Sequence, residues 1–421
     1  MPDAATALTL QDKLAAVKTA STALATATTE QKHVALLAIA EAVRTGAERI
    51  LPANELDLAN GRENGIGAGL LDRLRLDQAR LDGLAEAVEV VVGLDDPVGE
   101  VVRGRALPNG LQISQVRVPF GVIGAIYEAR PNVTIDIAAL AIKSGNAVVL
   151  RGGSAASHTN GVLVELLREA LVSAGLPADA VQSIDEFGRD GATELMRARG
   201  FVDVLIPRGS AQLIQTVVRE STVPVIETGA GVVHIYLDES ADEVMAVDIV
   251  RNAKVQRPSV CNAVETVLVH AGAAERLLGP VLTALQESQV TIHADERSIG
   301  VVPGALPVTD EDYATEHMAL ELSVRVVDSM DEAIAHIRSF STAHTESIIT
   351  NDLGNAERFL REVDSAVVMV NASTRFTDGG EFGFGAEVGI STQKLHARGP
   401  MGLPELTSTK WIVRGQGQVR G

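Results

Sequence analysis

The sequence of 421 residues contains a single cysteine, Cys261, so no disulfide can form within the chain and a four-cysteine zinc site is excluded. Aromatic residues make up only 3% of the chain, which argues against the stacking platforms that bind single-stranded nucleic acid. No window approaches the roughly 18 uncharged apolar residues that a membrane-spanning helix needs. The chain has no basic residue before Lys13 and no long apolar segment at its start, so no secretory signal is predicted and a cytosolic location is expected.

Positive charge is also scarce. The chain has 36 Lys and Arg residues against 55 Asp and Glu residues, which gives a net charge of −19. Such a chain repels phosphodiester backbones and anionic lipids, so neither nucleic acid nor a membrane is expected as a partner. Apolar residues make up 46% of the chain and charged residues 22%, a balance that indicates large folded cores. At ~150 residues per domain, the length predicts two or three domains.

Residues 1–95 alternate alanine- and leucine-rich stretches with charged positions. The spacing of Leu36, Ile39 and Val43 predicts an amphipathic helix over 30–50, and residues 70–92 follow a similar pattern. Residues 100–118 instead alternate apolar and polar side chains around an Asn-Gly turn, which predicts a β-hairpin. An isolated hairpin is only marginally stable in water, so this one is expected to pack on another domain or another subunit.

Strands alternate with helices beyond residue 119. The first run has expected strands at 121–126, 147–150, 202–206 and 223–226, with helices at 131–143, 155–174 and 210–220. The second run has expected strands at 233–237, 264–269, 290–293, 347–350 and 366–370, with helices at 241–254, 273–287, 331–339 and 354–362. This alternation predicts parallel sheets covered by helices on both faces. The expected fold class is therefore α/β, with two lobes built on parallel-rich sheets.

Familiar cofactor fingerprints are absent: there is no Gly-x-Gly-x-x-Gly, no Walker A loop and no His-Glu-x-x-His. Two glycine-bearing turns, residues 151–154 and 208–210, do connect a predicted strand to a predicted helix. Each is either an ordinary connecting loop or a phosphate site at a helix N-terminus. Two such turns in one sheet favour a nucleotide at its carboxyl edge.

Cys261 lies among the polar residues Arg257, Ser259 and Asn262, close to Pro258, which interrupts regular structure. A lone cysteine is either a small buried apolar residue or a nucleophile, and a nearby cation lowers the thiol pKa and favours the second interpretation. Glu227, 34 residues upstream, ends another predicted strand and is followed by Thr228-Gly229.

Together these features resemble the aldehyde dehydrogenase superfamily, in which a glutamate–glycine turn precedes the catalytic cysteine by a comparable distance and a Gly-Ser turn lies before that. Within the superfamily, four longer motifs are similar to the gamma-glutamyl phosphate reductases. These motifs are Tyr127–Thr134, Asn252–Pro258, Val370–Phe376 and Ser391–Leu403. The resemblance spans essentially the whole chain.

The resemblance implies an aldehyde dehydrogenase-like fold of two Rossmann-like lobes with a separate oligomerisation element. Residues 1–99, 119–232 and 371–400 would form an NADP-binding domain, 233–370 a catalytic domain carrying Cys261, and 100–118 with 401–421 an oligomerisation hairpin and tail. A homodimer or a dimer of dimers is expected. The strand-like run 409–413, which holds Trp411, either pairs between subunits or packs on its own subunit.

The resemblance also implies a reaction: the NADPH-dependent reduction of L-glutamyl 5-phosphate to L-glutamate 5-semialdehyde, in proline biosynthesis. Channelling with glutamate 5-kinase is a further expectation. Cys261 would be the nucleophile that forms a thioester, and Asn132 would either donate to the oxyanion or only cap its helix. The residues expected to bind the anionic substrate are Arg130, Arg257 and Arg398, and the alternative for each is a solvated charge or a structural ion pair.

The expected cofactor is NADP(H). In this superfamily the residues that decide between NADP and NAD follow the strand that ends here at Leu150, and Arg151, Gly152 and Ser154 occupy those positions with no acid before Glu165. The resemblance further assigns to the cofactor Gly209, Ser210 and Glu227. No metal is expected, and Glu227 is not expected to be essential, because a reductase of an acyl phosphate needs no base to activate water.

Two other functions stay open from the sequence alone: an oxidising or CoA-acylating aldehyde dehydrogenase of the same fold, and a scaffold protein without catalysis. Five glycines crowd residues 378–390 and predict either a mobile loop over the active site or a set of tight turns.

Overall fold

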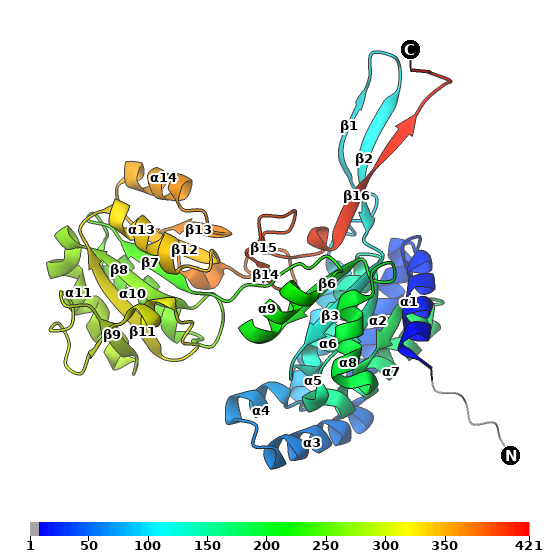
Figure 1. Cartoon of the computed structure of the whole chain (residues 1–421), viewed down its shortest axis with the longest axis horizontal. Helices are drawn as coiled ribbons and strands as arrows, with labels where there is room; N and C mark the ends of the chain where they lie inside the picture. The colour runs from blue at the N-terminus through cyan, green and yellow to red at the C-terminus, as the bar shows by residue number, and fades with distance from the viewer. Residues whose placement is uncertain (1–7, 421) are drawn as a thin grey trace. The chain divides into compact units, whose positions relative to one another are not determined.

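The computed structural model describes residues 8–420, which form two compact units (Figure 1). Unit 1 contains the described residues up to 227 together with 383–389 and those from 401 onward, and unit 2 contains 228–382 and 390–400. The prediction that the chain starts without a secretory signal concerns residues 1–7 among others, and these seven lie outside the described residues.

Unit 1 begins with helices α1 (Leu10–Leu24), α2 (Thr29–Thr45), α3 (Ala47–Glu63), α4 (Ala68–Leu74) and α5 (Gln78–Gly93). The single helix predicted over 30–50 is divided at Gly46, where a Cβ would lie 2.5 Å from the carbonyl oxygen of Ala42. The pattern over 70–92 is also divided, because Asp77 caps α5 by accepting a hydrogen bond from the backbone N–H of Arg80 at 2.9 Å.

A parallel sheet with the strand order β5-β4-β3-β6 forms the core of unit 1. Its strands are β3 (Val122–Tyr127), β4 (Ala147–Arg151), β5 (Val181–Ser183) and β6 (Val204–Arg208), and its helices are α6 (Pro131–Lys143), α7 (Ser157–Ser173), α8 (Gly188–Arg197) and α9 (Ala211–Glu220). The chain starts at β3, adds β4 and β5 on one side and then returns with β6 on the other. Because the direction of winding reverses at β3, ligands are expected beyond the carboxyl ends of β3 and its neighbours.

The strand predicted over 223–226 is reduced to an isolated bridge between Leu205 and Val225. Pro224 lies within it and has no N–H to donate, which limits how far a ladder can extend here. The helices predicted over 131–143 and 210–220 are confirmed by α6 and α9.

A second, antiparallel sheet of unit 1 has the order β1-β2-β16. It contains β1 (Val101–Ala106), β2 (Gln112–Pro119) and β16 (Thr407–Arg414), and it stands away from the helices of the same unit (Figure 1). The hairpin over 100–118 is therefore confirmed, with Gly110 in its turn at φ +86°. The tail packs on the hairpin of its own chain along the full length of β16, and among residues 8–420 β1 and β16 pair with no strand other than β2.

Unit 2 is built on a seven-stranded parallel sheet with the order β10-β9-β11-β8-β7-β12-β13. The strands are β7 (Val233–Leu237), β8 (Val264–His270), β9 (Thr291–Ala294), β10 (Leu306–Pro307), β11 (Glu321–Val327), β12 (Thr345–Ile349) and β13 (Val367–Val370). The helices are α10 (Glu243–Val255), α11 (Ala271–Glu287), α12 (Asp310–Ala314), α13 (Met330–Phe340) and α14 (Leu353–Glu362), and a short antiparallel pair joins β14 (Ile390–Ser391) to β15 (Gly399–Pro400).

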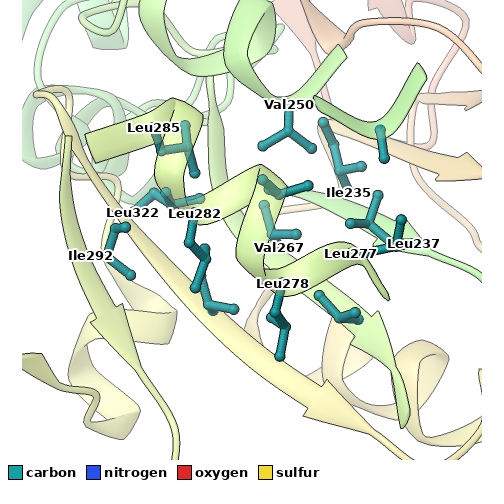
Figure 2. Close-up of a cluster of buried hydrophobic side chains, with 14 of the residues drawn as sticks. Ile235, Leu237, Val250, Val267, Leu277, Leu278, Leu282, Leu285, Ile292 and Leu322 are labelled. Carbon is teal, nitrogen blue, oxygen red and sulfur yellow. The ribbon is translucent and has the colours of Figure 1, made fainter. Parts of the chain in front are cut away.

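Apolar side chains cover both faces of this sheet. Leucines of α11 and Val250 of α10 pack against Ile235, Val267 and Leu322 of the strands (Figure 2). A second buried cluster packs α13 and α14 against Tyr236, Leu268 and Ile348. Burial on both faces explains the many valine, isoleucine and leucine residues of these strands, as expected for a parallel sheet, while polar side chains such as Glu265 and Glu346 are buried among them.

The boundaries of the two units differ from the predicted domain bounds at residues 228–232 and 371–400. The prediction joined all of them to the first domain, whereas 228–232, 371–382 and 390–400 lie in unit 2. Hydrogen bonds account for the difference: Asn262 donates to the carbonyl of Thr377 at 2.9 Å, and the hydroxyls of Thr345 and Thr377 are 2.9 Å apart.

Candidate functional site

Cys261 lies in the turn between α10 and β8, at the amino edge of the sheet of unit 2, and is half-buried. The backbone of Gly231, which precedes β7, lies directly against this turn. A Cβ built on Gly231 would be 1.5 Å from the carbonyl oxygen of Cys261, so no side chain fits there. The close approach of two backbones fixes the turn while leaving the thiol partly exposed.

The segment that follows β13 folds over the same turn. The Asn262 side chain donates to the carbonyl of Thr377, and the hydroxyl of Thr374 donates to the carbonyl of Asn262 at 2.7 Å. Arg375 donates from Nη1 to Asn262 Oδ1, and from Nε to Gln256 Oε1 at 2.9 Å. A guanidinium is therefore held by the residue next to the cysteine.

Arg375 is in electrostatic contact with the cysteine. Burial is the largest influence on its pKa and lowers it. The charge of Asp378, and that of Cys261 when it is ionised, oppose this effect, and the positive charge of Arg257 adds to it. The turn thus combines a thiol with two cations, the environment that favours a thiolate.

Buried charges lie behind the turn. Lys254 Nζ donates to Glu265 Oε2 at 2.7 Å with both side chains buried, and burial lowers the pKa of Lys254 and raises the pKa of Glu265 to about 7. Glu316 Oε1 accepts a hydrogen bond from the Gly231 N–H at 2.8 Å, and burial raises its pKa too. Because Gly231 touches Cys261, Glu316 helps to fix the position of the turn.

The residues assigned to the cofactor lie at the carboxyl edge of the sheet in unit 1. Gly152 donates its N–H to Asp185 Oδ1 at 2.6 Å, and a Cβ there would lie 2.0 Å from Asn160 Nδ2. Burial raises the pKa of Asp185, and the nearby Arg151 opposes that rise. Arg151 is half-buried, and its Nε is buried without a hydrogen-bond partner among the described residues. A phosphate-bearing cofactor fits this donor set.

A carboxylate occupies the second predicted phosphate site. Ser210 is the N-cap of α9, and its N–H and hydroxyl both donate to Glu128 Oε2 at 3.1 Å. A Cβ on Gly209 would lie 2.7 Å from the same oxygen. The turn after β3 that carries Glu128 includes Ala129 at φ +44°, a conformation uncommon outside glycine.

Asn132 lies in the first turn of α6 and does not cap it, because the N-cap position is Arg130 and no side chain bonds the cap. Its Nδ2 instead donates to Asp136 Oδ2 at 3.0 Å. Burial raises the pKa of Asp136 to about 6, while the Asn132 hydrogen bond and the charge of Arg208 oppose the rise. An amide nitrogen carries two N–H donors, so one remains for a ligand.

The other predicted residues are spread over both units. Arg257 is exposed in the Cys261 turn, without a hydrogen-bond or ion-pair partner among residues 8–420. Arg398 Nη2 donates to Asp364 Oδ1 at 2.9 Å, and Asp364 lies just before β13. Strand β13 is the third strand from β8 in the sheet, so these two strands are roughly 14 Å apart. Glu227 ends unit 1 and accepts a hydrogen bond from Gln215 at 3.0 Å. The structure thus brings Arg257 to Cys261 and holds Arg398 in an ion pair elsewhere.

Three contacts at these sites were missed by the sequence analysis: those of Glu128, Asp185 and Glu316. Their partners are 82, 33 and 85 residues away along the chain. Only the position of Glu128 inside a recognised motif could have drawn attention to it.

A sequence profile of the aldehyde dehydrogenase family matches residues 3–303. The fold is also that of an acetylating aldehyde dehydrogenase from Geobacillus thermoglucosidasius, with a TM-score of 0.71 at 18% identity over 98% of this chain and 97% of that one. The chain therefore belongs to the aldehyde dehydrogenase family of oxidoreductases, as the resemblance implied.

Comparisons with more similar proteins place the chain in one group within this family. A relative from Leifsonia xyli, named gamma-glutamyl phosphate reductase, is 73% identical over the whole of both chains. The crystal structure of the gamma-glutamyl phosphate reductase from Thermotoga maritima has a TM-score of 0.96 at 46% identity and covers 98% of this chain and 100% of that one. Within the family, the chain belongs to the gamma-glutamyl phosphate reductases.

Residues 8–420 contain no helix with the length and apolar character needed to cross a bilayer. In the same part of the chain, no three His, Cys, Asp or Glu side chains gather where they could hold a metal ion.

The contact between Gly231 and Cys261 gives a first prediction. Gly231→Ala should push the turn away and lower turnover about 100-fold, because a displacement of about 1 Å at a reacting group can cost that much. The measurement is kcat for aldehyde-dependent reduction of the nicotinamide cofactor. Gly279→Ala on α11, where a Cβ meets nothing within 4 Å, is the matched control. A Gly231→Ala enzyme with unchanged kcat would contradict the role assigned to this contact.

Proposed function

We propose that this chain reduces L-glutamyl 5-phosphate to L-glutamate 5-semialdehyde with NADPH, through a thioester on Cys261, as the second step of proline biosynthesis from glutamate. The observation that carries the proposal is the 73% identity, over both full lengths, to a protein named gamma-glutamyl phosphate reductase. The half-buried Cys261 beside Arg257 and Arg375 supports the chemistry.

The bonds change in two stages. The Cys261 thiolate attacks C5, a carbon–sulfur bond forms, and the C5–oxygen bond breaks as inorganic phosphate leaves with the electron pair. NADPH, when bound, supplies the hydride that reduces the thioester carbon. Cleavage of the carbon–sulfur bond then regenerates the thiolate and releases the aldehyde. Covalent catalysis replaces one difficult displacement by two easier ones.

Each stage passes through an oxyanion. We assign its stabilisation to the second N–H of the Asn132 amide and to the Cys261 backbone N–H, and losing one such donor typically costs ~10²–10³ in rate. Asp136, which accepts the first N–H, would keep the amide oriented. Arg130 and Arg257 are proposed to bind the anionic substrate, and Arg398 retains that role only if the substrate displaces Asp364.

An acyl phosphate hydrolyses in water, so a phosphotransferase must supply it, and we propose glutamate 5-kinase as that partner, with both enzymes in the cytosol.

The reverse reaction tests the function and the nucleophile together. NADPH formation from glutamate semialdehyde and NADP should require inorganic phosphate, and CoA or water alone should not replace it. Cys261→Ser should abolish turnover with the fold intact, because an alcohol is a far poorer nucleophile than a thiolate.

The same assay separates the alternatives. A serine variant that keeps more than about a tenth of the activity would rule out the covalent route. Glu227→Gln should lose much less than Cys261→Ser. A total loss in folded Glu227→Gln, or turnover without phosphate, would indicate an aldehyde oxidiser that needs a base for water.

We propose NADP(H) as the cofactor in preference to NAD(H). The half-buried guanidinium of Arg151 can pair with the 2′-phosphate, and the small, exposed Ser154 leaves room for it. A charge-assisted hydrogen bond contributes about 1.5–3 kcal/mol, or about 10- to 150-fold in affinity.

The cofactor preference is tested by kcat/KM for NADP and NAD in the wild type, Ser154→Glu and Ser154→Gln. The glutamate should lower the NADP/NAD ratio about 10- to 150-fold by repelling the phosphate, and the uncharged glutamine of equal size should change it much less. A wild type without a preference for NADP, or equal effects of both variants on the NADP/NAD ratio, would show that this loop does not recognise the charge of the 2′-phosphate.

Self-association is proposed to use the sheet β1-β2-β16. Trp411 and Val413 are 50% and 56% exposed and point to the same face, which Ile113 shares through its pairing with Val413. Exposed apolar faces with unpaired strand edges favour association between chains.

Removing residues after Pro404 should therefore lower the mass of the particle in solution. The double variant Trp411→Asp/Val413→Asp should do the same, and Lys410→Ala on the opposite face should not. Sedimentation that gives an unchanged oligomer for the truncated chain would exclude this interface.

A further inference from the structure

Unit 2 has a cavity of about 180 Å³ next to the turn that carries Cys261. It is lined by Asn252, Gln256, Arg375, Phe376, Asp378 and Glu381. At about 30 Å³ for each water-sized group, it has room for an ammonium, a carboxylate and the carbon that joins them.

Three of the lining side chains offer hydrogen-bond donors. Asn252 Oδ1 accepts a bond from the Ser373 hydroxyl at 2.6 Å, and Gln256 Oε1 accepts one from Arg375 Nε at 2.9 Å. Because both amide oxygens are used as acceptors, the amide nitrogens are left to donate. Arg375 bonds through Nε and Nη1, so its Nη2 remains a third donor, and this one is charged.

Two other lining side chains are carboxylates. Asp378 is half-buried, and its Oδ1 accepts the Gly380 N–H at 2.8 Å, which fixes the direction of the carboxylate. Glu381 is exposed. Both carboxylates act on the charge of Arg375 without a direct ion pair to it among the described residues.

This pattern of charge selects among ligands. A phosphate would meet two carboxylates in the same cavity, and an uncharged group would make no use of the charges of Arg375, Asp378 and Glu381. A group that carries a cation and an anion on one carbon offers a partner to the carboxylates and to the arginine, and Phe376 adds an apolar side chain to the same lining.

We propose that this cavity binds the α-amino acid end of the substrate, with the α-carboxylate on Arg375, Asn252 and Gln256 and the α-ammonium on Asp378 and Glu381. The inference rests on the proposed function, since it names which end of an amino-acid substrate lies here. Arg257, which is outside the lining, is left for the phosphate. Because Arg375 also bonds the residue after Cys261, the cavity positions the substrate relative to the nucleophile.

The test uses three aldehydes with phosphate and NADP: glutamate 5-semialdehyde, 5-oxopentanoate, which lacks the amine, and 4-aminobutanal, which lacks the carboxylate. For each aldehyde, kcat/KM of a variant is divided by kcat/KM of the wild type, so differences in cyclisation between substrates cancel. Asp378→Asn and Glu381→Gln remove charge from the acidic part, and Arg375→Lys keeps charge but loses the planar fork. Glu357→Gln, an exposed acid on α14, is the control.

The proposal expects losses that depend on the substrate. Asp378→Asn and the double variant with Glu381→Gln should lose about 10- to 150-fold on the two amine-bearing aldehydes and clearly less on 5-oxopentanoate. Arg375→Lys should lose more on the two carboxylates than on 4-aminobutanal.

Three results would overturn the cavity assignment. The first two are equal losses on all three aldehydes and kcat/KM ratios like those of the Glu357→Gln control. The third is a raised KM for phosphate in Arg375→Lys, which would assign the arginine to the phosphate. If Asp378→Asn does not fold, Glu381→Gln alone applies the same criterion, because its side chain is exposed. A wild type without phosphate-dependent activity would instead refute the proposed function, whereas an active wild type with unselective variants refutes only the cavity assignment.

Discussion

The contact between the backbones of Gly231 and Cys261 governs the arrangement at the amino edge of unit 2. With 1.5 Å between a hypothetical Cβ and the Cys261 carbonyl oxygen, the segment before β7 and the turn before β8 hold one another in place. Glu316 reinforces this through its bond to the Gly231 N–H. All of these restraints act on backbone groups. The proposed nucleophile needs an accessible sulfur on a fixed backbone, and restraints that act only on backbone groups are compatible with both requirements.

The same turn is held from its other side by the segment after β13. Asn262 uses its carbonyl, its amide nitrogen and its amide oxygen to bond Thr374, Thr377 and Arg375. The arginine that lines the cavity is therefore part of the support of the cysteine turn. Binding at the cavity and the position of the sulfur cannot vary independently, because Asn262 bonds Arg375 and is the residue next to Cys261.

Local periodicity was enough to predict most elements, because burial on one face of a helix or both faces of a parallel sheet leaves its mark on neighbouring residues. The prediction was wrong where a single residue ends an element: Gly46 and Asp77 divide predicted helices, and Pro224 limits a predicted strand. It also gave no element for β5, α8 or β11. The cysteine turn was found through its motif. The carboxylates of Asp185 and Glu316 bond partners far away in sequence, so no local pattern could assign their roles.

The net charge of a chain does not predict where an anion binds, and the carboxyl edge of the sheet in unit 1 shows why. A chain with a charge of −19 places a carboxylate, Glu128, on the N–H and hydroxyl of Ser210, where the dipole of α9 favours an anion. A phosphate that binds at this helix terminus has to replace that carboxylate and gains only the difference between the two anions. At the end of β4, Arg151 Nε has no hydrogen-bond partner among the described residues, and Oδ1 of the neighbouring Asp185 accepts a hydrogen bond from the Gly152 N–H. Electrostatics at this edge therefore favour an anion beside Arg151 over one at Ser210.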